Sequence, residues 1–169
     1  MSSVYERELK GILEGDDKTL SRVTKTCSAL EKEKYFLIRE RPFVVVRAAG
    51  SLGVDLVALR GDIAFLMEIK SSNSDTLHFS SVDGKLQRQA DRMRGECEKT
   101  KTLPVYGFRL KGHGEDAWRL FTMELPQLEG RARILHLRLP KLGRSKSGNY
   151  IMRWNDGLPL ADFIAYLCR

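Results

Sequence analysis

Three short apolar runs lie between residues 43 and 70 and predict β-strands. They cover residues 43–48, 55–60 and 63–70 and are rich in Val, Leu, Ile and Phe, a composition typical of strands. Gly61 and Asp62 separate the second run from the third, and a Gly-Asp pair at this place indicates a tight antiparallel turn. We therefore expect the last two runs to form a β-hairpin.

Apolar residues recur every three or four positions in other parts of the chain, which predicts helices. The predicted helices cover residues 3–14, 18–35, 83–98 and 158–168. Gly15 is placed to end the first helix, and Asp16 or Asp17 to cap the second. Residues 71–81 are polar and rich in serine, and we expect a loop there.

The second half of the chain contains further segments with strand patterns. Strands are predicted at residues 103–110, 117–123, 133–139 and 150–154. Residues 133–139 are assigned to a strand because charged and apolar side chains alternate there, and residues 141–149 to a loop. A β-hairpin that is followed by a helix and more strands predicts an α/β protein, with a mixed central β-sheet flanked by helices.

Composition narrows the classes of function. At 169 residues the chain is expected to be a single domain, residues 1–169. Its formal net charge of +7 favours a polyanionic partner, either nucleic acid or an anionic membrane. Its apolar runs are far shorter than the roughly 20 residues of a membrane span, and MSSVYERELK is not expected to be a signal peptide because it lacks an apolar run. Three distant cysteines without metal-ligand spacing predict reduced thiols in a cytoplasmic protein.

Charged residues at the ends of the predicted hairpin indicate the chemistry. Glu68 and Lys70 follow the apolar run 63–67, and they share one face because side chains alternate along a strand. Asp55 opens the preceding strand, so the hairpin would return Asp55 to the side of Glu68. Buried charges are costly unless they are paired or used. Two carboxylates beside a lysine fit a divalent-metal site for phosphodiester cleavage.

Three sequence blocks carry a resemblance to a known family. The blocks are Tyr5–Lys10, Phe43–Ser51 leading into Val54–Leu56, and Glu68–Ser71. Together they resemble the archaeal-type Holliday junction resolvases, a branch of the PD-(D/E)xK nuclease superfamily, over residues 4–14 and 43–123. The resemblance implies a restriction-endonuclease-like core. It leaves an apparent helical insertion at residues 16–38 and an unmatched extension at residues 124–169, and Val54 stands where many superfamily members have proline.

The resemblance also implies roles for individual residues. The catalytic set that it implies is Glu6, Ser51, Asp55, Glu68 and Lys70. The implied ligands of Mg²⁺, for which Mn²⁺ would substitute, are Asp55, Glu68, the carbonyl oxygen of Ile69 and Glu6. The arginines that it implies at DNA phosphates or the active site are Arg7 and Arg47.

Each of these residues has a structural alternative when it is considered alone. Glu6 has the spacing of a capping box with a preceding serine, so it could serve only the start of the helix. Asp55 could be a turn residue, and Glu68 with Lys70 could be a solvated salt bridge. The nuclease interpretation is favoured because the blocks are separate in sequence, yet each falls where one active site would need it.

A basic segment lies near the end of the chain. Residues 131–153 contain seven Lys or Arg residues and no acid. A solvated surface is the usual role of such a run, but in a nuclease it favours a surface that follows DNA phosphates. The residues assigned to this surface are Arg138, Lys141, Arg144 and Lys146.

These features lead to one preferred function and two alternatives. The preferred function is a Mg²⁺-dependent, structure-selective endonuclease that resolves four-way DNA junctions in recombination and repair, as a homodimer at the nucleoid with no membrane partner. The alternatives are a restriction-like or repair endonuclease that acts on duplex, nicked or flapped DNA, and an inactive basic nucleic-acid-binding module. Two apolar stripes are candidates for a dimer surface: Leu20, Val23, Cys27 and Leu30 in one, and Leu160, Phe163, Ile164 and Leu167 in the other.

Overall fold

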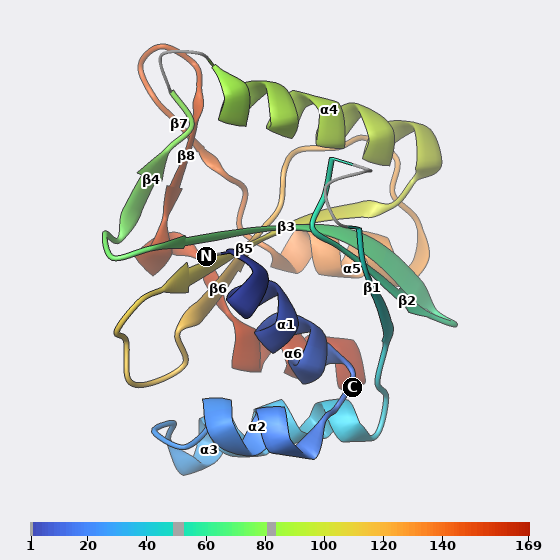
Figure 1. Cartoon of the computed structure of the whole chain (residues 1–169). Helices are drawn as coiled ribbons and strands as arrows, with labels where there is room; N and C mark the ends of the chain where they lie inside the picture. The colour runs from blue at the N-terminus through green and yellow to red at the C-terminus, as the bar shows by residue number, and fades with distance from the viewer. Residues whose placement is uncertain (1, 49–52, 81–83) are drawn as a thin grey trace.

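A mixed β-sheet lies at the centre of the molecule (Figure 1). The computed structural model describes residues 2–48, 53–80 and 84–169, and within these ranges six strands form the sheet in the order β1-β2-β3-β5-β6-β9. The strands are β1 (Val44–Arg47), β2 (Leu56–Arg60), β3 (Ile63–Ser72), β5 (Leu103–Leu110), β6 (Trp118–Phe121) and β9 (Leu158–Pro159). Neighbours are antiparallel except β3 and β5, which are parallel. The expected mixed central sheet is confirmed.

Helices flank this sheet on both sides. They are α1 (Ser2–Leu13), α2 (Asp17–Val23), α3 (Ala29–Phe36), α4 (Lys85–Thr100), α5 (Gly130–Arg138) and α6 (Leu160–Cys168), with short 3-10 turns η1 (Leu37–Arg39) and η2 (Trp154–Asp156). In Figure 1, α1 and α6 lie on one side of the sheet with α2 and α3 beyond them, and α4 lies on the other. No described helix is both long and apolar enough to cross a bilayer.

The core holds the sheet against α6. Phe65 of β3 makes edge-to-face contacts with Phe43 at 5.1 Å and with Phe163 of α6 at 5.8 Å between ring centroids. Leu160, Phe163, Ile164 and Leu167 are all buried in this core, so this predicted stripe is not available for a dimer surface. In the other stripe, Leu20 is also buried, whereas Leu30 remains exposed.

The predicted helix over residues 18–35 is wrong in one respect, because the chain forms two helices there. Asp16 caps α2, and its side chain accepts a hydrogen bond from the Thr19 amide. The chain turns after Val23, and α3 then starts at a capping box in which Ser28 and Glu31 satisfy each other's amides. The Ser-x-x-Glu spacing was the sequence signal for this second start.

Residues 71–81 are not the loop that their polarity predicted. Strand β3 continues to Ser72, and Thr76–His78 form β4, which pairs with β8 (Tyr150–Arg153) in a small second sheet. Within the predicted loop 141–149, Gly143–Arg144 form β7, which also pairs with β8. Residues 81–83, where the predicted loop ends and the next helix was expected to begin, lie outside the described residues.

The strand predicted at residues 133–139 is wrong, because this segment is helix α5. Leu135 and Leu139 are buried one helical turn apart, while Ile134 and Leu137 are 56% and 71% exposed. Alternation and helical periodicity both place residues 135 and 139 on one face. The exposure of Leu137 distinguishes the helix from a strand, which would place Leu137 on the buried face. That exposure follows from packing that the sequence pattern does not reveal.

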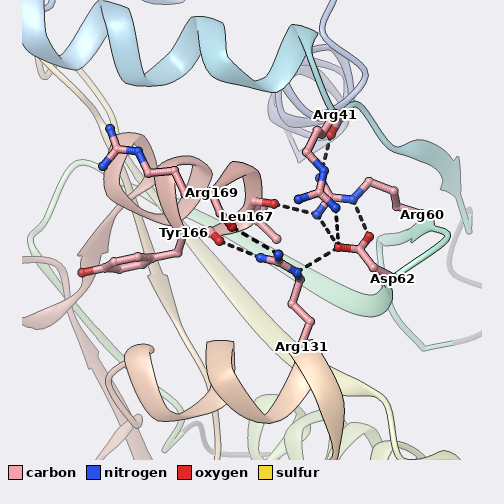
Figure 2. Close-up of polar contacts among 7 residues, drawn as sticks. All are labelled: Arg41, Arg60, Asp62, Arg131, Tyr166, Leu167 and Arg169. Carbon is pink, nitrogen blue, oxygen red and sulfur yellow. Dashed lines mark hydrogen bonds and ion pairs between the residues drawn. The ribbon is translucent and has the colours of Figure 1, made fainter.

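A charged cluster joins the turn of the β2–β3 hairpin to distant elements (Figure 2). This Asp62 cluster consists of Asp62 with Arg41, Arg60 and Arg131. The carboxylate pairs with Arg60 at 2.6 Å, Arg131 at 2.9 Å and Arg41 at 3.0 Å. Arg60 also donates to the carbonyl of Leu167, and Arg131 donates to the carbonyls of Tyr166 and Arg169. The cluster therefore ties the hairpin to α5 and to the end of α6.

Candidate active site

The hairpin brings Asp55 beside the end of β3, as the sequence predicted. The Asp55 amide donates to the Met67 carbonyl at 2.9 Å. The Asp55 carboxylate in turn accepts a hydrogen bond from the Ile69 amide at 2.7 Å. These two contacts on either side of Glu68 fix the position of the Asp55 side chain relative to β3.

Glu68 and Lys70 form a pair on one face of β3. Their Oε1 and Nζ atoms are 3.2 Å apart, and Glu68 is only 7% exposed. Burial raises the pKa of Glu68 to about 7; the charge of Lys70 opposes this shift, and the charges of Asp55 and Glu6 add to it. The pair is therefore largely buried, and Lys70 does not fully offset the cost of burying the Glu68 charge. This argues against the solvated salt bridge considered as an alternative.

Glu6 reaches the same region from α1. Its Oε2 atom accepts hydrogen bonds from Nη2 of Arg47 at 2.9 Å and from Nε at 3.2 Å. Glu6 is 8% exposed, and its hydrogen bonds with Arg47 join α1 to the end of β1. This pairing argues against the alternative in which Glu6 serves only as a helix cap.

Electrostatics show that these groups act on one another. Burial raises the pKa of Asp55; the hydrogen bond from the Ile69 amide opposes that rise, and the negative charge of Glu6 adds to it. The cations Lys70 and Arg47 lower the pKa of Asp55 to a smaller extent. The predicted catalytic residues that the structure describes therefore form one cluster with Arg47, and this cluster has more acids than bases. Its members are Glu6, Asp55, Glu68, Lys70 and Arg47.

The donor set fits a hard divalent cation, although it is not a closed cage. In the parts of the chain that the structure describes, no group of three or more His, Cys, Asp or Glu side chains is placed to hold a metal ion. Asp55 and Glu68 supply two carboxylates with raised pKa values. The N–H and C=O of one strand residue point to the same side, so the Ile69 carbonyl faces the Asp55 side, where β2 has not yet begun. Two carboxylates and a main-chain oxygen are ligands that Mg²⁺ accepts.

Two further predicted residues, Ser51 and Arg7, are not seen in this cluster. Ser51 lies outside the described residues. Arg7 is exposed on α1, next to Glu6 in sequence but on a different side of the helix.

The residues predicted to follow DNA phosphates lie in two places, near the end of α5 and on the β7–β8 hairpin, rather than on one strand. Arg138 is exposed, with its guanidinium 4.8 Å from the ring centroid of Tyr166. Lys141 donates to the carbonyls of His136 and Leu139 at the end of α5, so its ammonium is already engaged. Arg144 is exposed and stacks on the ring of Tyr150 at 4.0 Å, and Lys146 is exposed in the turn that follows.

Sequence reasoning missed two residues beside the site. Arg92 of α4 is exposed, and a Cβ atom at Gly53 would lie 3.5 Å from its Nη1 atom. The guanidinium therefore lies beside the backbone two residues before Asp55. Tyr106 pairs with Glu68 across the parallel strands and is buried, which raises its pKa. A basic residue on the helix after the Glu-x-Lys strand was the available signal for Arg92, whereas Tyr106 is indistinguishable from a core residue in sequence.

Two comparisons place the chain among known proteins. A solved structure of Archaeoglobus fulgidus Hjc, a Holliday junction resolvase from an archaeal hyperthermophile, is 19% identical and has a TM-score of 0.49, over 73% of this chain and 82% of that one. The sequence model of the archaeal Holliday junction resolvase (Hjc) family matches residues 22–136. The matched part includes Asp55, Glu68 and Lys70 and begins after Glu6 and Arg7. The chain belongs to the archaeal Holliday junction resolvase family.

Proposed function

We propose that this protein is a Mg²⁺-dependent endonuclease that resolves four-way DNA junctions by paired hydrolysis of phosphodiester bonds. The observation that carries the proposal is the cluster of Asp55, Glu68 and Lys70 at the end of β3. Family membership supports branched DNA as the substrate. The net charge of +7 is suited to a polyanion that is recognised through its phosphates.

The residues of the site divide the chemistry among them. Asp55 and Glu68 would hold the cation with the Ile69 carbonyl, and the Ile69 amide keeps the Asp55 carboxylate aimed at that point. When bound, Mg²⁺ supplies a lowered pKa for a coordinated water and neutralises charge on the scissile phosphate. Lys70 lies within hydrogen-bond reach of Glu68, where it orients the attacking water and offsets the negative charge that develops at phosphorus.

Glu6 and Arg47 complete the surroundings of the site. Glu6 adds a third acid within electrostatic reach of Asp55 and Glu68, which favours a water-mediated contact to the cation. Arg47 donates to this carboxylate through Nε and Nη2 and offers its remaining donors to a DNA phosphate. Mn²⁺ should substitute for Mg²⁺ because both prefer oxygen ligands.

One cleavage assay separates the proposal from its alternatives. The protein is incubated with a four-way junction, a linear duplex and a flap, each with and without Mg²⁺. Cleavage of the junction alone, and only with the cation, supports the proposal. Equal cleavage of duplex or flap favours a restriction-like or repair endonuclease, and binding without cleavage of any substrate favours an inactive binding module.

Resolution of a junction needs two nicks, and each chain holds one Asp55–Glu68 pair, so we propose a homodimer. An exposed apolar face on the β1–β2 edge of the sheet is suited to it. Val44 and Val46 of β1 are 64% and 49% exposed and Leu59 of β2 is 44% exposed. Val44 and Leu59 are direct cross-strand partners, so these side chains share one face.

We predict that Val46→Asp converts the dimer to monomers that nick but do not linearise a cruciform plasmid, because burying an unpaired carboxylate in a dry interface is costly. Light scattering gives the mass, and gel analysis of the plasmid gives the cut pattern. Leu30→Asp is the matched control, since Leu30 of α3 is also exposed, at 60%, but lies on another element. If only the Leu30→Asp variant dissociates, the interface lies on the α2–α3 surface and not on the β1–β2 edge.

A further inference from the structure

A groove lies between α1 and α2, on the side of α1 away from the Glu6 carboxylate. It has a volume of about 310 Å³ and is lined by Val4, Arg7 and Glu8 of α1 and by Thr19 and Arg22 of α2. In Figure 1, α2 lies directly below α1, and the two helices are in contact. The resemblance implied a place for Arg7 at DNA phosphates or the active site, but it gave Arg22 and α2 no role.

The sequence fixes the two walls of the groove close together. Gly11 of α1 allows the approach, because a Cβ atom there would lie 2.5 Å from Oγ1 of Thr19. Thr19 is itself held by Asp16, which accepts hydrogen bonds from its amide and hydroxyl at 2.9 and 2.7 Å. The start of α2 is therefore anchored against α1, and Arg22, one turn after Thr19, is brought to the rim.

The charges that line the groove are predominantly positive. Glu8 is the acid at its base, and its Oε1 atom already accepts hydrogen bonds from Arg109 at 2.8 Å and from Trp118 at 2.9 Å. The other carboxylate oxygen of Glu8 is 3.9 Å from Arg22, a long contact, and 62% of the Arg22 side chain is exposed. Arg7 is exposed and takes part in no hydrogen bond or ion pair with another described residue. Two guanidinium groups thus line the groove, and Arg109 compensates the charge of its one carboxylate, that of Glu8.

We infer that α2 extends the DNA-binding surface, with Arg22 and Arg7 together binding phosphates of one duplex arm at this groove. The inference rests on the proposed function, because it takes DNA as the substrate; α1 directs Glu6 toward the site and Arg7, on a different side of the helix, toward the groove. Arginine suits this role because its planar fork matches two phosphate oxygens. Arg22 positions and retains the substrate and takes no part in the chemical step.

The test is the affinity for a four-way junction across a salt series, with Ca²⁺ in place of Mg²⁺. Arg22→Ala should weaken binding several-fold and lower the slope of log K against log salt by about 1, as expected for one lost phosphate contact. The single-turnover cleavage rate at saturating junction should not change. Arg22→Lys should keep most of the slope, since it retains the charge.

Lys32→Ala is the matched control, because Lys32 is an exposed cation on α3 that does not line the groove. Unfolding curves check that each variant is folded. A slope for Arg22→Ala equal to that of Lys32→Ala overturns the inference, provided that the wild-type protein binds and cuts the junction. Failure of the wild-type protein to bind or cut would instead overturn the proposed function.

Discussion

The two ends of the β2–β3 hairpin carry carboxylates in opposite electrostatic situations. At the turn, hydrogen bonds from Arg60 lower the pKa of Asp62 to about 2. At the open end, burial raises the pKa of Glu68 to about 7 and also raises that of Asp55. The strands are the same, and fewer than ten residues separate Asp55 from Asp62 in sequence.

The difference follows first from the deeper burial of Glu68 and Asp55 and then from the balance of acids and bases at each end. Asp62 is one acid facing three guanidinium groups, and its charge is fully compensated (Figure 2). At the open end, three acids face two bases: Glu6, Asp55 and Glu68 with Arg47 and Lys70. A compensated cluster stabilises the fold, whereas a buried excess of acids is unfavourable, and under the proposed function a bound cation would offset it. The comparison thus separates a structural charge cluster from the cluster to which we assign the chemistry.

The largest expected effect comes from removing one acid at the open end. Glu68→Gln or Asp55→Asn should lower the single-turnover cleavage rate by about 100-fold or more, because under the proposed function each deletes a charge that would hold the cation. Junction binding should survive or tighten, since a negative charge beside DNA is lost. Asp62→Asn is the control at the other end of the hairpin and should cut at the wild-type rate. Wild-type cleavage by both open-end variants would contradict the assignment of the site.

The second effect appears in stability at the turn. Asp62→Asn should lower the free energy of unfolding by about 2 kcal/mol, because it removes charge-assisted hydrogen bonds and leaves three arginines without their shared partner. Denaturant unfolding at neutral pH measures it. Wild-type stability in this variant would show that the Asp62 cluster does not hold the hairpin to α5 and α6.

The smallest effect is a dependence of stability on pH, with a predictable sign. The folded-state pKa of Glu68, about 7, lies above its ordinary value of 4.5, so the folded state binds the proton more tightly. The stabilisation is full below about pH 4.5 and is lost as the pH rises through about 7. In the metal-free protein, Glu68→Gln should therefore be more stable than wild type by on the order of 1 kcal/mol at pH 8, with little difference at pH 4. Denaturant curves with a chelator present test this, and an equal difference at both pH values would refute it.

The hairpin and its acids were predictable because their signals are local. Alternation along β3 placed Glu68 and Lys70 together, and the Gly61–Asp62 turn returned Asp55 to them. The pairing of Glu6 with Arg47 was not predicted, since it joins residues 41 positions apart in sequence. The resemblance implied only that Glu6 is catalytic and that Arg47 serves DNA phosphates or the active site. The three arginines around Asp62 have no sequence signature, because they come from separate elements that only the finished fold brings together.

The errors arose where tertiary packing decides between two patterns. Segment 130–138 became a helix because Leu135 and Leu139 suit either periodicity, and the sheet surface selects the helical one. Thr76–His78 became a strand because β8 offers it a partner from much later in the chain. In both cases the deciding contact is distant in sequence, so local composition carries no information about it.

The parallel pairing of β3 with β5 also controls when the nuclease can first exist during protein synthesis. Glu6, Asp55, Glu68 and Lys70 are all translated before β5. Until residues 103–110 emerge, β3 lacks one neighbour, and α6, whose Phe163 packs on Phe65, follows later still. Such non-local contacts form after local ones. A chain whose translation stops early would thus carry the proposed catalytic residues without the scaffold that positions them.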